Sequence, residues 1–347
     1  MTTLWFLLVA VMLVAYVVFD GFDLGVGAIY KLAARTPDER AVVRRSIGPV
    51  WDANEVWLLA AGGTLYFAFP QLYASSFSGF YLPLMVVLWL MIGRAIGLEI
   101  RSHADEPLFA ELCDTVFMVS SILLPVFFGA ALGNVIRGVP LDRDSTFFLP
   151  LWTNFRPGPD PGVLDWYTVI CGVVALVALA THGAHYLALR TTGDLNRRAR
   201  AIARAGTLLL PVVTAVSLAA TVAVRPTVLE NFRTHPVGFL IPAAVVASLV
   251  TMALAARRGR ERTAFIASVV YLAMMLGGAA FALFPVLLPS STDPALSLTI
   301  ENAATGSYAM RTALRWWPFA FLLVAATFFH LYRTFRGKLA GGGDGHY

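Results

Sequence analysis

Carboxylates lie inside two stretches of the chain that otherwise read as membrane-spanning helices. PVWDANEVWLLAAGGTLYFAF carries Asp52 and Glu55, and FDGFDLGVG carries Asp20 and Asp23. Each pair has i,i+3 spacing, so its two carboxylates project from one helix face. Ionisable groups are costly inside a membrane, and those found there usually line a polar path or a partner interface. The two pairs are therefore the first candidates for a functional site.

The next apolar run ends in GRAIGLEIRS, which adds Arg94, Glu99 and Arg101. Acids outnumber arginines in these runs, so we expect at least one acid to carry a proton. Simpler interpretations stay open. Asp52 and Asn54 could cap the helix that they begin, and Glu99 could only pair with Arg94 or with an arginine at the interface.

The composition is typical of a membrane protein. Of the 347 residues, 58% are hydrophobic and 14% are charged, and the mean hydropathy is +0.71. Soluble domains are nearer about 45–50% apolar and about 25% charged.

Apolar runs long enough to cross about 30 Å of hydrocarbon recur along the chain. They predict an all-α polytopic protein with nine transmembrane helices in one domain, 1–338, and a flexible tail, 339–347. The period-2 alternation of a membrane barrel is missing. The first run lacks a basic n-region and a cleavage site, so we expect a retained helix. The expected helices are about 4–29, 50–70, 79–100, 115–136, 164–189, 205–224, 237–256, 264–288 and 314–335.

Basic residues predict the orientation. Most of the 26 Lys and Arg residues lie in one set of loops and at the C-terminus. The positive-inside rule then places the N-terminus outside and the C-terminus in the cytoplasm. Asp23 is eight residues before Lys31, so the acids lie in the cytoplasmic half of the membrane. The net charge of +5 follows from this topology and needs no nucleic-acid partner.

Small residues accompany the acids. Gly21 and Gly25 form a GxxxG pattern, which lets a second helix approach and shield the carboxylates from lipid. We expect the same packing role for Gly62 and Gly63. The two cysteines predict neither a disulfide framework nor a metal site.

Several motifs together resemble subunit II of the cytochrome bd-type quinol oxidases. They are FDGFDLGVG, WDANEVWLLAAGGTLYFAFP, FSGFY, GRAIGLEIRS, LGNVIRGVP, THGAHYLALRTTGDL and FPVLLPSST. The resemblance runs from Trp5 to about Arg336, nearly the whole chain. One departure is Ala53, where the family usually carries Gly; this change of one small residue for another puts little in doubt.

The resemblance implies a role that depends on a partner. In that family, subunit I binds the haems b and d and oxidises quinol, and subunit II packs against it as a pseudo-symmetric twin. Each subunit has two four-helix bundles and one peripheral helix. Dioxygen is reduced to water with protons from the cytoplasm, so turnover is electrogenic without pumping. The resemblance implies the bacterial cytoplasmic membrane as the location, with lipid around the complex.

The resemblance also assigns residues. Asp23, Asp52 and Arg94 match positions associated with the cytoplasmic proton route, and we add Glu55 and Glu99 to it. Trp57 matches a position beside a proposed oxygen passage, or it could face the partner. We expect Asp52 and Asp23 to face one another from consecutive helices.

The histidines do not predict a haem held by this chain. His182 and His185 share a helix at i,i+3 and cannot ligate one haem from opposite faces; His103, His235 and His346 fall in loops or the tail. We therefore expect no ligated cofactor or metal here.

Two rival classes remain. A secondary transporter would also bury acids and an arginine, but usually at the midplane beside a broken helix. A purely structural assembly subunit would use the acids for docking and stability. The sequence leaves open the choice of menaquinol or ubiquinol, a bound structural quinone and small accessory subunits.

Overall fold

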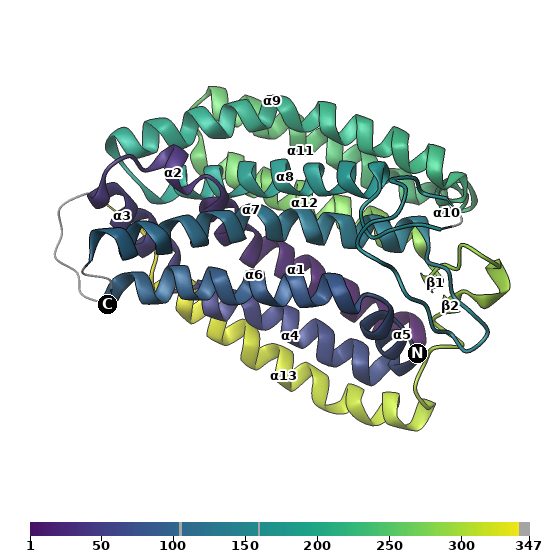
Figure 1. The fold of residues 1–347 in the computed structure, drawn as a ribbon. Helices are drawn as coiled ribbons and strands as arrows, with labels where there is room; N and C mark the ends of the chain where they lie inside the picture. Colours follow the sequence, from purple (N-terminus) through teal and green to yellow (C-terminus); the bar gives the residue numbers. More distant parts are fainter. Residues whose placement is uncertain (104–105, 159, 340–347) are drawn as a thin grey trace.

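The computed structural model describes residues 1–103, 106–158 and 160–339. Long helices run side by side along one axis (Figure 1). The α-helices are α1 Thr2–Ala28, α2 Tyr30–Ala33, α3 Pro37–Ile47, α4 Trp51–Ala68, α5 Pro70–Gly79, α6 Tyr81–Glu99, α7 Pro107–Arg137, α8 Trp166–Arg190, α9 Gly193–Val224, α10 Glu230–Thr234, α11 Leu240–Arg257, α12 Glu261–Leu283 and α13 Ser307–Thr334. Short 3-10 turns are η1 Ile100–His103, η2 Pro226–Leu229, η3 Pro236–Phe239 and η4 Pro294–Leu296, and the strands are β1 Val286–Leu288 and β2 Leu298–Thr299.

Within these residues, eight helices are long and apolar enough to cross a membrane, so the chain is a multi-pass membrane protein. They are α1, α6, α7, α8, α9, α11 (with η3), α12 and α13. The remaining expected span corresponds to α4, which carries Asp52 and Glu55 and is not among the eight. The count of nine therefore stays a prediction.

Four expected boundaries were wrong by five residues or more. The spans placed at 115–136 and 314–335 begin earlier, at Pro107 and Ser307. The span placed at 264–288 ends at Leu283, and its last residues form β1, which pairs antiparallel with β2. The span placed at 205–224 begins at Gly193, because a basic, amphipathic segment continues the helix for three turns before the apolar run.

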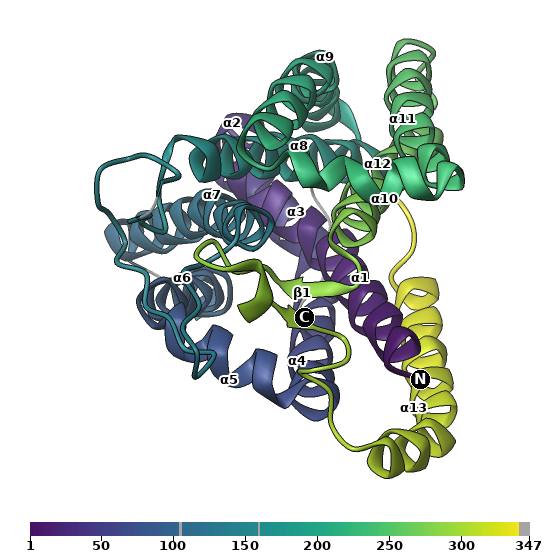
Figure 2. The same ribbon diagram turned by 90° about the vertical axis from the view of Figure 1, so that its right-hand side faces the viewer.

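The long connections at the N-terminal end of α1 form an ordered cap. The Val139 amide donates to the carbonyl of Pro289 over 3.0 Å, and the Ser291 amide donates to the carbonyl of Val139 over 2.9 Å. Figure 2 shows β1 and the neighbouring loops covering this end of the helices. We call the other end, where α2, α3 and the basic loops lie, the basic end.

Helix α1 runs through the interior and packs against α4, α7, α8 and α12. Gly25 makes the contact with α8 possible. A Cβ at Gly25 would lie 1.9 Å from the carbonyl oxygen of Leu179, and one at Gly183 would lie 2.3 Å from the backbone of Gly25. Gly21 also faces Leu179. The packing expected for these two glycines is thus present within the chain.

Gly62 and Gly63 differ, because a Cβ at either would have no neighbour within 4 Å among the described residues. They lie on α4, which runs with α6 and α13 along one side of the molecule (Figure 1). Their expected packing role therefore needs a neighbour outside the described residues.

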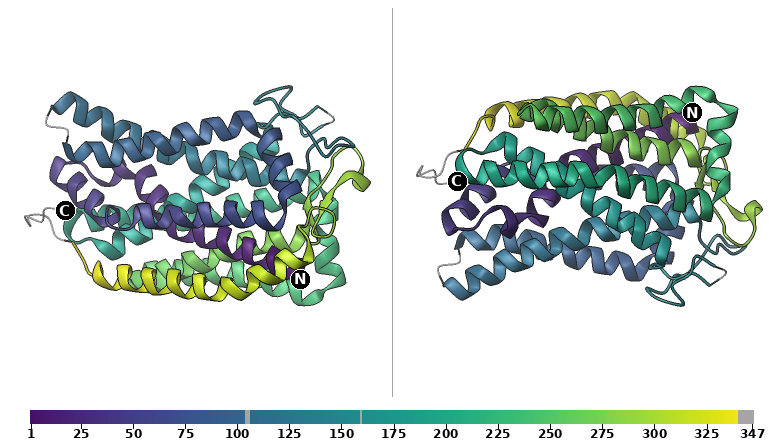
Figure 3. Two further views of the ribbon diagram at one scale, coloured as in Figure 1. Left: turned by 90° about the horizontal axis from the view of Figure 1, so that it is seen from below. Right: turned by 90° about the horizontal axis from the view of Figure 1, so that it is seen from above.

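Helix α13 lies at the periphery (Figure 3). Only Met310 of its residues is buried. It is held by aromatic contacts, including Trp317 on Trp5 at 5.3 Å and Phe328 on Phe19 at 5.2 Å between ring centroids.

Candidate functional site

Arg94 on α6 connects two carboxylates inside the helix bundle. Its Nη1 donates to Oδ1 of Asp20 on α1 over 2.7 Å, and its Nη2 donates to Oε1 of Glu55 on α4. Arg94 and Asp20 are buried, with 2% and 0% exposure. The guanidinium also lies 5.8 Å from the centre of the Trp51 ring. One cation therefore joins acids from two further helices.

Asp23 has a different partner. Its Oδ2 accepts from Nδ2 of Asn54 over 2.7 Å, and the same amide nitrogen reaches the carbonyl of Phe19 over 3.3 Å. The hydroxyl of Tyr332, on α13, donates to Oδ1 of Asn54 over 2.8 Å. A hydrogen-bonded chain therefore runs from α13 through α4 to a buried acid on α1. In the described residues, Asp23 forms no ion pair, and its Oδ1 is buried without a hydrogen-bond partner.

Helix α4 has no side-chain cap: its N-cap residue is Val50, and no side chain accepts from the first turn. The capping interpretation of Asp52 and Asn54 was therefore wrong. Asn54 was noticed in the sequence only as a cap, whereas in the structure it holds Asp23.

Asp52 lies on the outer face of α4 and is exposed, so the structure brings Asn54, and not Asp52, to Asp23. Glu99 is exposed at the end of α6, a turn beyond Arg94. The alternative in which Glu99 serves as the acid of Arg94 does not hold, since Asp20 and Glu55 take that place.

Trp57 is buried, with 8% exposure. It packs against Phe19, Phe321 and Phe328, at 6.2, 5.9 and 5.4 Å between ring centroids. The ring therefore fills the space between α1, α4 and α13. Its expected role beside an oxygen passage or a partner stays a prediction.

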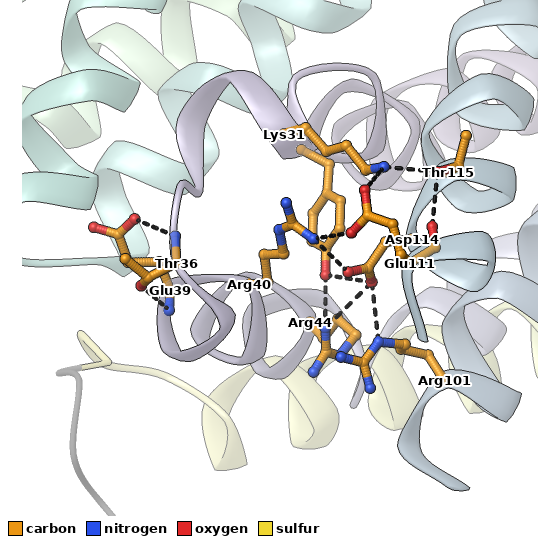
Figure 4. A network of polar contacts seen from close by, with 10 residues as sticks. Lys31, Thr36, Glu39, Arg40, Arg44, Arg101, Glu111, Asp114 and Thr115 are labelled. Carbon is orange, nitrogen blue, oxygen red and sulfur yellow. Dashed lines mark hydrogen bonds and ion pairs between the residues drawn. The ribbon is translucent and has the colours of Figure 1, made fainter. Parts of the chain in front are cut away.

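Arg101 belongs to a second network, at the basic end, that the sequence did not reveal (Figure 4). Asp114 on α7 has 2% exposure and accepts from Arg40, Arg44 and Arg101 over 3.0, 3.5 and 3.2 Å. The Tyr30 hydroxyl also donates to it over 3.0 Å. We call Asp114 with these four partners the Asp114 clamp.

The Asp114 clamp joins the α2–α3 segment, η1 and α7. Next to it, Glu111 accepts from Lys31 and from Arg40, each over 2.6 Å. Burial raises the pKa of Tyr30, which keeps its hydroxyl protonated as a donor. A lone acid at the basic end of an apolar helix, with arginines in the neighbouring loops, was the sequence signal for this clamp.

The two histidines of α8 are engaged by side chains and backbone of this chain. His182 contacts the Ser268 hydroxyl through Nδ1 over 2.7 Å and the Val18 carbonyl through Nε2 over 3.0 Å. His185 contacts Thr207 over 3.1 Å. Because both ring nitrogens of His182 are occupied, it does not fit the role of a haem ligand. The part of the chain described here holds no cluster of three metal-ligating side chains.

Nearly the whole chain matches a known protein family. A family model described as cytochrome bd terminal oxidase subunit II matches residues 1–335. The chain is 34% identical over 340 residues to cytochrome bd-I ubiquinol oxidase subunit 2 of Escherichia coli K12, covering 90% of this chain and 88% of that protein. It is 32% identical over 312 residues to cytochrome bd ubiquinol oxidase subunit 2 of Bacillus subtilis 168, covering 89% and 88%.

The fold is also that of a solved structure. A chain of the bd oxidase from Geobacillus thermodenitrificans superposes with a TM-score of 0.76. The match covers 96% of this chain and 98% of the other, at 17% sequence identity. At that identity the likeness concerns the fold alone.

Proposed function

Since the chain belongs to the cytochrome bd terminal oxidase subunit II family and is a subunit of a quinol:oxygen oxidoreductase, we propose that it supplies protons to, and supports, a haem-bearing subunit I. The haems b and d of that partner supply the redox chemistry that reduces dioxygen with electrons from quinol. This chain contributes proton-carrying groups and the surface that holds the partner. The complex sits in the bacterial cytoplasmic membrane.

The proposed topology has nine spans, with α4 as the ninth, and the N-terminus outside. Helices α1, α4, α6 and α7 form one four-helix bundle, α8, α9, α11 and α12 form the other, and α13 is peripheral. The contacts of α8 with α9 and of α11 with α12 support the second group. The basic end faces the cytoplasm under the positive-inside rule.

The observation that carries the proton route is the set of acids on α1 and α4, of which Asp20 and Asp23 are buried. Asp20 and Glu55 share Arg94, whereas Asp23 has, among the described residues, only the neutral amide of Asn54 as its hydrogen-bond partner. A carboxyl group without a cation exchanges its proton at lower cost than one locked in an ion pair. Asp23 is therefore the proposed proton carrier, Arg94 pairs with the two neighbouring acids, and Asn54 positions the carrier.

The proposed partner surface is a stripe on α4. Residues 52, 56, 59, 63 and 66 follow i, i+4, i+7, i+11 and i+14 spacing, which places them on one helix face. Each of the five is exposed: Asp52, Val56, Leu59, Gly63 and Tyr66. Lipid would cover the apolar members, but it is a poor neighbour for Asp52. A partner that covers this stripe would contact both Asp52 and Gly63. Glu55 lies one residue before Val56 of the stripe.

The experiment substitutes the proposed carrier. Asp23→Asn preserves shape and hydrogen bonding to Asn54 but removes the titratable group. We expect a complex with normal haem content that loses most of its quinol-driven oxygen consumption, and the same for Asp52→Asn if protons enter at the stripe. Asp38→Asn, an exposed acid on α3, is the matched control and should retain native turnover.

Native turnover of Asp23→Asn with full haem content would remove Asp23 from the route. Joint loss of haem and activity would favour the rival in which the acids serve assembly alone. An ion-coupled transporter is disfavoured, because the helices that carry the acids, α1 and α4, have no proline in their interiors.

A further inference from the structure

A cavity of about 590 Å³ opens at the basic end between α1, α8, α12 and α13. Its apolar wall includes Phe19 and Phe22 of α1, Leu189 of α8, and Phe265 and Val269 of α12. The volume is within the range of about 300–1,000 Å³ that small ligands occupy. No residue of the proton route proposed above lines it.

The wall offers no free hydroxyl to a ligand. The Tyr186 hydroxyl donates to the carbonyl of Ser46 over 2.7 Å, and the Ser46 hydroxyl donates to the carbonyl of Val43 over 2.7 Å. The Tyr332 hydroxyl is engaged by Asn54 over 2.8 Å. The inner part of the cavity is therefore suited to hydrocarbon.

The mouth of the cavity is cationic. It is lined by Arg190, Arg336 and Lys338, of which Lys338 is paired with Glu261 over 2.6 Å. Over the described ranges, neither arginine forms an ion pair. Arg190 donates from Nη1 to the carbonyl of Gly337 over 2.6 Å, and its Nε is buried without a partner. Arg336 is exposed. Two guanidinium groups therefore face the mouth without an acid.

We propose that this cavity binds one anionic phospholipid of the adjacent leaflet, with its phosphate at Arg190 and Arg336 and an acyl chain against Phe22, Phe265 and Val269. Guanidinium groups form charge-assisted, often bidentate hydrogen bonds with phosphate. Basic pockets between membrane helices on the cytoplasmic side recognise anionic headgroups in this way. A neutral quinone would leave both charges unmatched, and a free anion would leave the apolar wall uncovered.

The test uses the complex of this chain with its haem subunit, stripped of lipid in detergent. Phosphatidylglycerol and phosphatidylcholine with identical acyl chains are titrated, and the thermal midpoint of the complex is followed. We expect phosphatidylglycerol to raise the midpoint at concentrations at which phosphatidylcholine does not. Arg190→Gln and Arg336→Gln should each weaken its apparent affinity about tenfold, the factor expected from losing a charge-assisted hydrogen bond.

Arg333→Gln is the matched control, because Arg333 is exposed at the end of α13, three residues before Arg336, and does not line the cavity. Val269→Trp fills the cavity and should abolish retention of phosphatidylglycerol in native mass spectrometry while both arginines remain. Glycerol phosphate, the headgroup without acyl chains, should not protect.

Three results would overturn the proposal. They are equal affinity of the Arg190→Gln, Arg336→Gln and Arg333→Gln complexes, equal protection by phosphatidylcholine, or full protection by glycerol phosphate alone. Because Arg336 is exposed, its substitution probes binding without disturbing the fold.

Discussion

At the scale of single residues, Arg94 holds the interior of the bundle together. It is the only cation that contacts Asp20 and Glu55 in the described residues, and it reaches them from a third helix. A buried ion pair adds little net stability, because desolvation offsets the attraction, but removing one member leaves an uncompensated charge. Removal of Arg94 should therefore lower the free energy of unfolding by more than the loss of its hydrogen bonds alone would.

Arg94→Gln should destabilise the complex by about 3–5 kcal/mol, the usual cost of breaking a buried pair. We expect little assembled complex in membranes and a lower thermal midpoint for what remains. Arg94→Lys keeps the charge but not the fork geometry, and should retain an intermediate amount of complex. A native midpoint for Arg94→Gln would contradict the importance of the ion pairs that Arg94 forms with Asp20 and Glu55.

The sequence could indicate these acids but not their partners. The i,i+3 pairs and Arg94 were visible as charges in apolar runs. Which acid meets which residue depends on helix rotation, and so Asn54 was assigned to a cap while Asp20 was left out of the proposed route. Asp114 was missed because a single acid beside a helix end is indistinguishable from an interfacial residue until the loops fold over it.

At the scale of elements, the contact between α1 and α8 depends on two glycines facing each other. Gly25 and Gly183 leave room for backbone against backbone, so neither position accepts a side chain without moving a helix. The same packing role was expected for Gly25 and Gly63. Within the described residues, a neighbouring helix is present at Gly25 and missing at Gly63.

Gly25→Ala should destabilise the folded chain by about 1–3 kcal/mol or more, because the added methyl group collides with backbone that cannot rotate away. The yield of detergent-stable chain should fall accordingly. Gly277→Ala is the control, since a Cβ there meets nothing within 4 Å in the described residues. Equal yields for the two variants would contradict the close approach of α1 and α8.

The predicted helix ends were accurate where charged residues bound the apolar run, as at Trp166–Arg190. The predictions were wrong where a helix continues beyond its apolar run. The N-terminal turns of α9 carry Arg197, Arg198 and Arg200, which the hydropathy pattern could only assign to a loop. Helix propensity does not stop at the lipid surface, and arginine is a good helix former.

At the scale of the whole molecule, substitutions in the stripe on α4 should affect docking of the partner without affecting the folding of this chain. Gly63→Leu adds volume where the described residues leave no neighbour within 4 Å, so the chain itself should fold normally. We expect co-purification of the haem subunit to fall severalfold while the yield of this chain is unchanged. Gly277→Leu is the size-matched control, and native co-purification with Gly63→Leu would place the partner elsewhere.

The orientation gives a further prediction. A reporter fused after Lys338 should be active only if it needs the cytoplasm, because the basic end carries most of the arginines. A reporter that requires export should be silent at that site. The opposite result would put the acids in the half of the membrane that faces away from the cytoplasmic proton supply.

The Asp114 clamp also implies an order of events during synthesis. Arg40 and Arg44 emerge well before α7, so they first act as unpaired charges that hold the α2–α3 segment on its side of the membrane. Asp114 reaches them only once α7 has inserted. The charges that anchor the early chain are then neutralised by a later helix. The Asp114 clamp can therefore form only after α1, α4, α6 and α7 have been inserted, and it then fixes the α2–α3 segment to α7.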